Sequence, residues 1–173
     1  MRIGGLQKLT LLDYPGKAAC TVFLIGCNLR CPYCHNPGLV LPESMDGQEI
    51  SADEILGFLE QRRGKLDGVC ITGGEPTLWQ ELPEFISDIR SLGYAVKLDT
   101  NGTNPDMLKE LLSDGLLDYV AMDIKNGPSR YAITCGGEDV IDSVRESAAL
   151  LLNGTAEYLS LIHISEPTRH AQI

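Results

Sequence analysis

Three cysteines lie close together in the sequence, at a spacing that could hold an iron–sulfur cluster. Cys27, Cys31 and Cys34 form a C-x₃-C-x₂-C triplet directly after a short apolar segment. Three thiolates within so short a stretch can ligate three irons of a [4Fe–4S] cluster and leave one iron open. A structural zinc ion would instead require a fourth ligand, which the neighbouring His35 could supply. The spacing alone leaves both kinds of metal centre open.

Three further groups of glycine and polar residues each follow an apolar, strand-like segment. They are Thr72-Gly73-Gly74-Glu75-Pro76, Asp99-Thr100-Asn101-Gly102 and Asp123-Ile124-Lys125. Glycine pairs commonly end strands in ordinary turns, and Asp and Asn commonly cap helices or stabilise turns. These residues therefore have structural explanations as well as functional ones, and a cofactor role depends on where the fold places them.

The sequence alternates apolar segments of strand type with amphipathic segments of helical type. The predicted strands are 19–25, 68–72, 94–98 and 117–124, and the predicted helices are 51–63, 82–92, 104–112 and 139–152. Ser51 and Glu54 form an S-x-x-E capping box at the start of the first helix. This alternation predicts right-handed βαβ units and a parallel sheet with both faces covered. Because chemistry in such sheets lies at the carboxyl ends of the strands, the cysteine triplet and the three polar groups are expected there.

Composition limits the class of protein. The chain has 173 residues, 43% of them hydrophobic, and a formal net charge of −10, which fits one globular domain and excludes disorder. The acidic excess argues against general nucleic-acid binding, and no apolar run approaches the ~20 residues of a membrane span. The beginning of the sequence lacks the basic and apolar regions of a secretory signal. We therefore expect a cytoplasmic protein whose six cysteines are metal ligands or free thiols.

Four motifs in order resemble those of the radical S-adenosylmethionine (SAM) superfamily. The triplet, with Tyr33 before its last cysteine, is similar to the signature C-x₃-C-x-aromatic-C, and residues 72–76 are similar to the GGEP motif. Residues 99–102 resemble the D-T-N-G segment of glycyl-radical activating enzymes, and residues 123–125 resemble their D-x-K element. The closest likeness is to the anaerobic ribonucleoside-triphosphate reductase activating proteins. It covers residues 3 to about 158 and includes GGLQKLTLLDYPGK at residues 4–17.

The resemblance implies a fold, an activity and its partners. The fold would be an α/β partial (βα) barrel, with about four βα units present of an expected six. The enzyme would cleave SAM reductively at a [4Fe–4S] cluster held by Cys27, Cys31 and Cys34, giving methionine and a 5′-deoxyadenosyl radical. That radical would generate a glycyl radical on anaerobic ribonucleotide reductase. Reduced flavodoxin or ferredoxin would be the electron donor.

The resemblance also assigns residues to the cofactors. The SAM-binding set would be Tyr33, Gly73, Gly74, Glu75, Asp99, Thr100, Asn101, Asp123 and Lys125. The backbone carbonyls of Gly73 and Gly74 would approach the SAM ammonium, because glycine has no Cβ in the way. Glu75 would add a negative charge near that ammonium, and Lys125 would face the SAM carboxylate. A monovalent cation would have Asp99, Thr100 and Asp123 as oxygen ligands.

The other cysteines and two nearby side chains receive structural interpretations. Cys20 and Cys70 lie in apolar strand segments, where a free thiol behaves as a small hydrophobe, and Cys135 lies in a predicted loop without a partner at ligand spacing. Trp79 is predicted to pack against a helix. His35 is predicted to be a neighbour of the cluster, because a fourth protein ligand would block SAM.

Two alternative functions remain beside the activase. One is a small-molecule radical SAM enzyme, such as a modified-nucleobase synthase, with a similar small barrel. The other is an iron–sulfur or zinc binding module without turnover. The match over residues 4–17 favours the activase over the first alternative, and SAM cleavage by a reconstituted protein would exclude the second.

The end of the sequence differs from the rest. Residues 159–169 (LSLIHISEPTR) resemble no part of the family and match the in-frame translation of a transposase-type sequencing adapter. We therefore expect a truncated radical SAM core domain over residues 1–158 and a non-native tail over 159–173. The apolar, β-branched start of this tail could imitate a strand beside the segment 117–124. Because the missing units would help to cover the sheet and bind SAM, we expect poorer folding, impaired activity and an exposed sheet edge.

Overall fold

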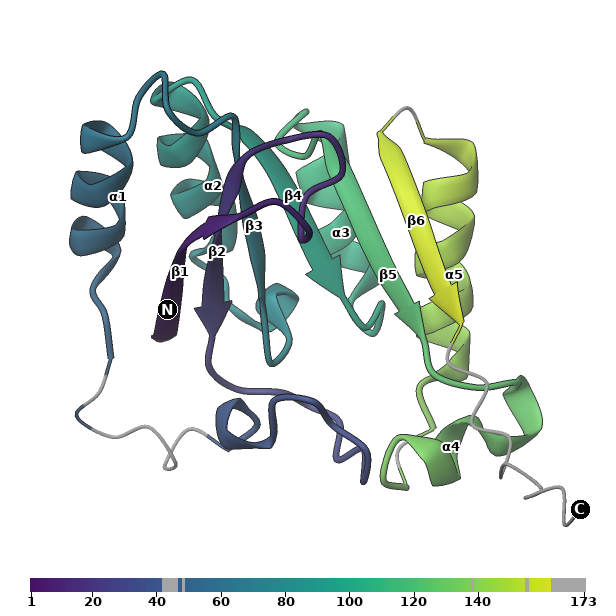
Figure 1. Cartoon of the computed structure of the whole chain (residues 1–173). Coiled ribbons are helices and arrows are strands. Elements are labelled where there is room, and N and C mark those ends of the chain that lie inside the picture. Colours follow the sequence, from purple (N-terminus) through teal and green to yellow (C-terminus); the bar gives the residue numbers. More distant parts are fainter. Residues whose placement is uncertain (42–46, 48, 138, 155, 163–173) are drawn as a thin grey trace, which may run out of the picture.

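The computed structural model describes residues 1–162 except 42–46, 48, 138 and 155. Within this part of the chain, six strands form one sheet in the order of the sequence (Figure 1). The strands are β1 (Ile3–Thr10), β2 (Ala19–Leu24), β3 (Gly68–Gly73), β4 (Ala95–Thr100), β5 (Tyr119–Ile124) and β6 (Glu157–Ile162). β1 is antiparallel to β2, and every later pair is parallel. Sequential parallel order is the connectivity of a (βα) barrel, so the predicted fold class is confirmed.

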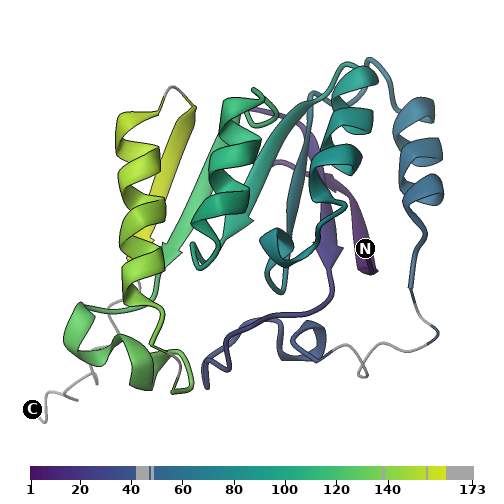
Figure 2. The same ribbon diagram turned by 180° about the vertical axis from the view of Figure 1, so that it is seen from behind.

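Four longer helices lie on one face of the sheet (Figure 2). They are α1 (Ala52–Gln61), α2 (Leu82–Ser91), α3 (Pro105–Ser113) and α5 (Ile141–Asn153). The loops contain the short elements η1 (Pro37–Leu39), η3 (Pro76–Leu78), η4 (Pro128–Arg130) and α4 (Tyr131–Thr134). No helix in the described residues is long and apolar enough to cross a membrane.

Local sequence signals set the ends of the helices. The Ser51 hydroxyl accepts a hydrogen bond from the Glu54 N–H at 3.2 Å, and the Glu54 carboxylate accepts one from the Ser51 N–H at 2.9 Å. This is the predicted capping box at the start of α1. The Asn104 side chain accepts from the Met107 N–H at 3.3 Å and caps α3 in the same way. Gly93 follows α2 with a φ of +93°, the left-handed conformation that glycine adopts without strain.

Alternate residues of the strands point toward the helices and form the core. These side chains are apolar and almost fully buried, since each strand presents every second residue to the same face. They include Cys20, Val22, Leu24, Val69, Ile71, Val96, Leu98, Val120 and Met122. The helices contribute buried partners such as Ile55, Leu59, Phe85, Ile86, Ile89, Leu108, Leu111 and Val144. Burial of this continuous apolar surface is the main stabilising contribution to the fold.

The opposite face of the sheet carries polar side chains, which corrects the expectation of an apolar sheet covered on both faces. Thr21 is the register partner of Cys70, and Cys70 is the partner of Lys97, so one row of inward residues crosses β2, β3 and β4. Asp99 follows two positions later on β4, beside Ala121 of β5. Helices cover only the other face, and this polar face is the inside of the partial barrel.

The segment after β1 crosses the polar face near the amino ends of the parallel strands, in the upper part of Figure 1. The Tyr14 side chain is 2% exposed, and its ring lies 6.0 Å from the ring of Tyr119. A Cβ added to Gly68 would lie 3.0 Å from the Tyr14 ring, so glycine at this point of β3 lets the ring settle on the sheet. The Thr21 hydroxyl donates to the Asp13 carboxylate at 2.6 Å, which fixes the segment beside β2. The sequence analysis predicted neither β1 nor this packing.

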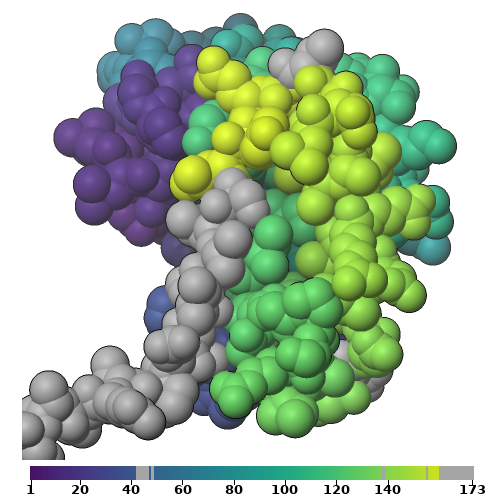
Figure 3. Space-filling model, turned by 90° about the vertical axis from the view of Figure 1, so that its right-hand side faces the viewer, coloured from purple at the N-terminus to yellow at the C-terminus, as the bar shows by residue number. Residues whose placement is uncertain are grey.

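The last strand contains the beginning of the adapter-like run. β6 pairs in parallel with β5 from Tyr119 opposite Glu157 to Ile124 opposite Ile162. Tyr158 and Leu159 are 43% and 42% exposed, and β6 and α5 form one edge of the molecule (Figure 3). Residues 163–173 of the predicted tail lie outside the described residues. The proposed boundary at residue 158 stays a prediction.

Substitutions at Tyr14 measure how much this residue contributes to the fold. The Tyr14 hydroxyl is buried and makes no hydrogen bond to the described residues. Replacement by phenylalanine removes only this hydroxyl, so we expect Tyr14→Phe to keep or raise the free energy of unfolding by up to about 1 kcal/mol. Tyr14→Ala empties the space under Gly68 and is expected to lower it by about 3–5 kcal/mol. Urea unfolding of both variants tests this, and equal losses would contradict the packing role.

Candidate functional site

A cavity of about 410 Å³ lies at the carboxyl ends of β2 to β5. Its lining includes nearly all of the predicted site residues, namely Cys27, Cys31, Tyr33, Cys34, Gly73, Gly74, Asp99, Thr100, Asn101, Asp123 and Lys125. A larger cavity of about 960 Å³ lies at the amino ends of the strands, and none of these residues lines it. The smaller cavity is the candidate site, because it gathers residues from four strand ends that could bind cofactors.

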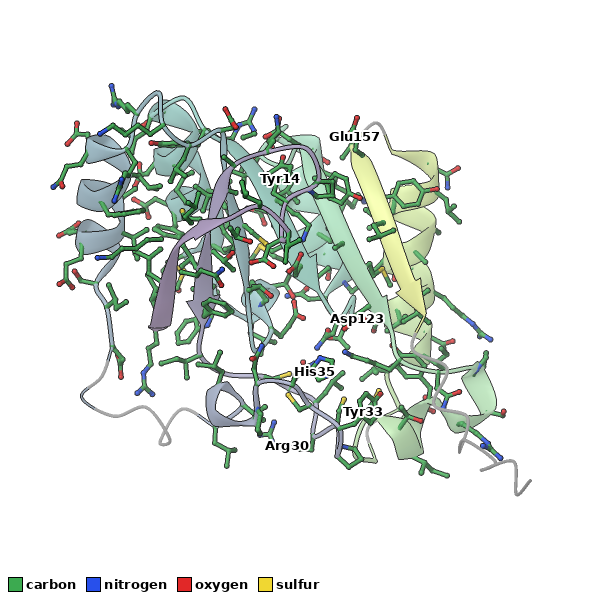
Figure 4. The ribbon with its side chains drawn as sticks, in the orientation of Figure 1. Tyr14, Arg30, Tyr33, His35, Asp123 and Glu157 are labelled. Atoms are coloured by element: carbon green, nitrogen blue, oxygen red, sulfur yellow. The ribbon has the colours of Figure 1, made fainter. Side chains whose placement is uncertain are left out.

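The cysteine triplet lies in the loop that follows β2. Leu29 is 2% exposed and anchors this loop in the core, while the Cys34 N–H donates to the Cys31 carbonyl at 3.1 Å. Figure 4 shows Tyr33 and His35 of the loop below the end of β5, where Asp123 lies. Burial raises the pKa of the Cys27 thiol.

The arrangement of the thiols distinguishes the two kinds of metal centre. Among the described residues, no three His, Cys, Asp or Glu side chains converge on a point where one metal ion could be held. A zinc ion needs such convergence. In an iron–sulfur cluster each thiolate binds a different iron, so the thiols remain apart. The described residues therefore do not form a site for a single zinc ion.

Cys135 lies against the cysteine loop, although the sequence analysis placed it in a loop without a partner. Its side chain is fully buried at the end of α4, and its carbonyl accepts from the Arg30 N–H at 2.9 Å. Burial and the neighbouring Cys31 raise the pKa of Cys135 to about 12. A Cβ on Gly136 would lie 2.7 Å from the Arg30 carbonyl oxygen, so this segment packs closely on the loop. The contact was not predicted because Cys135 is about a hundred residues away from the cysteine loop in the sequence.

Two glycines join the end of β3 to the end of β2, which gives a reason for glycine beside the predicted approach to SAM. A Cβ on Gly73 would overlap the backbone of Leu24, and one on Gly74 would overlap the backbone of Gly26. The Gly74 N–H donates to the Leu24 carbonyl at 2.9 Å. Gly73 also has a φ of +122°. Glycine is required here by contact between two protein backbones, whatever else approaches from the cavity.

Glu75 is the one predicted site residue that does not line the cavity. It is fully buried, and its carboxylate accepts hydrogen bonds from the Thr77 N–H, the Thr77 hydroxyl, the Thr100 hydroxyl and the Asn101 N–H, at 2.6–3.1 Å. Burial raises the pKa of Glu75, and these four donors oppose the rise. The carboxylate ties the end of β4 to the loop after β3. The expected contact with the SAM ammonium stays a prediction, since the geometry engages both oxygens internally.

The D-T-N-G segment is held from two sides. The Asn101 side-chain amide donates to the Asn28 side chain at 3.1 Å and approaches the Cys27 sulfur at 3.9 Å, which links it to the cysteine loop. The hydroxyl of the fully buried Ser147 on α5 donates to the Gly102 carbonyl at 2.8 Å. Asn101 thus lies between the loop after β2 and the loop after β4, beside the predicted cluster ligand Cys27.

Two of the aspartates that line the cavity, Asp99 and Asp123, each have a lysine beside them. Lys97 forms an ion pair with Asp99, and Lys125 forms one with Asp123. Burial alone would lower the pKa of Lys97, but Asp99 and Cys70 outweigh it and raise the pKa above its usual value. Lys97 is only 5% exposed and lines the cavity. The sequence analysis gave Lys97 no role.

Comparison with known proteins identifies the family. The sequence pattern of the Radical SAM superfamily matches residues 21–159. The chain belongs to this superfamily. A relative in Methanocaldococcus jannaschii that bears the name glycyl-radical enzyme activating enzyme is 41% identical over 130 residues, which is 75% of this chain and 52% of the relative.

Other radical SAM relatives carry different names. The pyruvate formate-lyase-activating enzyme of Clostridium pasteurianum is 36% identical over 133 residues, covering 72% of this chain and 52% of that protein. A 7-carboxy-7-deazaguanine synthase of Aquifex aeolicus is 36% identical over 88 residues, covering 51% and 38%. The structure of native anSMEcpe with bound AdoMet is similar with a TM-score of 0.62 at 21% identity, over 80% of this chain and 41% of that one. This chain spans about half the length of the first two relatives.

The glycine contact predicts the effect of a single methyl group. Gly74→Ala would push β3 away from Gly26, immediately before Cys27, so we expect a loss of stability of about 1–3 kcal/mol together with impaired cluster binding. If Gly74 served only the approach to SAM, the variant would instead form the cluster normally and bind SAM more weakly. Urea unfolding and the iron content after anaerobic reconstitution decide between them. Gly57→Ala in α1, where a Cβ meets open space, is the control.

Proposed function

We propose that the cavity holds a [4Fe–4S] cluster on Cys27, Cys31 and Cys34, with SAM beside it. Three observations support this: the thiols do not converge on one ion, the chain belongs to the radical SAM superfamily, and the predicted SAM-binding residues line the same cavity. When bound, the cluster would supply the electron that cleaves SAM into methionine and a 5′-deoxyadenosyl radical. The chain's own contribution is to position the cofactors and to exclude water from them.

Particular residues have particular tasks in this proposal. Tyr33 flanks the last ligand, and the Asn101 amide approaches the Cys27 sulfur, where a donor would stabilise negative charge on a thiolate. Gly73 and Gly74 form the wall between the cysteine loop and β3. Lys125 offers its ammonium to the SAM carboxylate, while its pairing with Asp123 holds the side chain in place.

The cluster ligands can be tested against a cysteine that touches them. Cys27→Ala, Cys31→Ala and Cys34→Ala are each expected to abolish a SAM-responsive [4Fe–4S] centre, since each thiolate binds a different iron. Cys135→Ala is the most demanding control because Cys135 is buried next to Cys31, and it is expected to keep the cluster. Iron and sulfide analysis with electron paramagnetic resonance after anaerobic reconstitution measures this. Loss of the cluster in Cys135→Ala would mean that the ligand set is wrong.

We infer that the reaction is activation of a glycyl-radical enzyme, with anaerobic ribonucleoside-triphosphate reductase as the partner. The observation that carries this is the 41% identity with a relative named for glycyl-radical enzyme activation, over three quarters of the chain. The segment 4–17, which resembles the reductase activases, supports the choice of partner because it builds β1 and the floor of the cavity. A cytoplasmic location and reduced flavodoxin or ferredoxin as the electron donor complete the proposal.

A second candidate is a small-molecule radical SAM reaction such as the synthesis of a modified nucleobase. It is favoured by the 36% identity with a 7-carboxy-7-deazaguanine synthase. That similarity covers only 51% of the chain, against 75% for the activating-enzyme relative. The activase is therefore the first candidate.

The two candidates differ in their products. The reconstituted chain, SAM, a chemical reductant and an anaerobic ribonucleotide reductase are expected to yield a glycyl radical on the reductase, seen by electron paramagnetic resonance. Cys31→Ala should give none, because no SAM is cleaved without the cluster. Release of 5′-deoxyadenosine without a glycyl radical, together with formation of 7-carboxy-7-deazaguanine, would favour the second candidate.

A further inference from the structure

The residues predicted to bind a monovalent cation are already engaged within the chain. Asp99 is paired with Lys97, and Asp123 is paired with Lys125. The Thr100 hydroxyl donates to the Glu75 carboxylate at 2.7 Å, and it accepts from the Gly102 N–H at 3.1 Å. A hard cation needs several oxygen atoms directed at one point. Here a lysine ammonium already neutralises each of the two carboxylates, and the Thr100 hydroxyl is engaged by Glu75, so the arrangement does not fit the expected cation.

Lys97 is built into the site. It lies on β4, is 5% exposed, and lines the candidate cavity. Its ammonium lies 3.6 Å from the Cys70 sulfur, and the Cys70 thiol donates to the Asp99 carboxylate at 3.5 Å, so three side chains close a triangle. The apolar neighbours Val96 and Leu98 point into the opposite, fully buried face and fix the direction of Lys97.

A second positive charge at Asp99 would be repelled by this ammonium. Like charges a few ångströms apart interact strongly where little water separates them, and a carboxylate already neutralised by lysine attracts a further cation weakly. Moving Lys97 aside would leave its ammonium buried without a counter-charge, which is also unfavourable.

We propose that the Lys97 ammonium supplies, from within the chain, the positive charge that a bound monovalent cation would supply at Asp99. SAM binding then requires neither Na⁺ nor K⁺. This inference rests on the proposed binding of SAM in this cavity. It makes Lys97 a positioning residue, which acts on the cofactor through Asp99.

The first test needs no substitution. The affinity of the reconstituted chain for SAM is measured anaerobically in choline chloride, NaCl and KCl at the same ionic strength. The proposal expects the three dissociation constants to agree within about twofold. An affinity about tenfold or more higher in NaCl or KCl than in choline chloride overturns it.

The second test removes the tethered charge. Lys97→Met keeps the length of the side chain, so in choline chloride SAM affinity is expected to fall by about tenfold or more, and KCl or NH₄Cl is expected to restore much of it. Lys109→Met, on α3 beside the other cavity, is the matched control and should behave as wild type. Unchanged affinity in Lys97→Met overturns the proposal, and so does a loss that no cation repairs.

A third measurement separates this inference from the proposed function. Thermal unfolding of the cluster-free chain requires no SAM. The midpoint of thermal unfolding of the wild type should be the same in choline chloride and KCl. Lys97→Met should unfold at a lower temperature in choline chloride than in KCl, because Asp99 then lacks its positively charged partner. If SAM fails to bind in every salt, the proposed function fails while these midpoints still decide the role of Lys97. Equal midpoints of Lys97→Met in both salts overturn it.

Discussion

The candidate site depends on one contact between backbones. The ends of β2 and β3 touch at Gly73 and Gly74, where any side chain would overlap Leu24 or Gly26. The Glu75 N–H then donates to the Gly26 carbonyl at 2.8 Å. Because Cys27 is the next residue, the loop that carries the thiols leaves the sheet from a point fixed by the neighbouring strand. Side-chain packing could adjust to small changes, but two main chains in contact cannot.

Buried polar groups connect this contact to the end of the next strand, β4, by hydrogen bonds. Glu75 is hidden behind the cavity wall and binds the hydroxyl of Thr100 and the N–H of Asn101. Asn101 in turn reaches the cysteine loop through Asn28. Glu75 thus holds the strand ends together from behind the cavity wall, whereas Lys97 faces the cavity. A buried carboxylate whose hydrogen bonds are all made holds its neighbours rigidly. The wall of the cavity therefore has a fixed shape.

The sequence was sufficient for what is local or periodic and insufficient for what depends on packing. Strand positions, the Ser51 capping box and the grouping of the motifs at one edge followed from periodicity and from the rule for parallel sheets. The contact of Gly74 with Gly26 could not be predicted, because it depends on strand register. Lys97 lies within a predicted strand, and its direction appears only when alternate residues are assigned to a face. Cys135 and Tyr14 are brought in by tertiary packing, which no spacing encodes.

The segment after β1, which lies across the amino-terminal end of the partial barrel, also limits how a large substrate could enter. Leu12 and Asp13 line the candidate cavity, Gly16 and Lys17 line the larger one, and Tyr14 is buried between them. Within the described residues this segment therefore separates the two cavities, and the candidate cavity is approached from the carboxyl ends of the strands. A polypeptide would have to arrive as a bend, with its tip leading and both arms remaining at the mouth. Only the residues at the tip of such a bend would enter the cavity, and an extended strand would not fit.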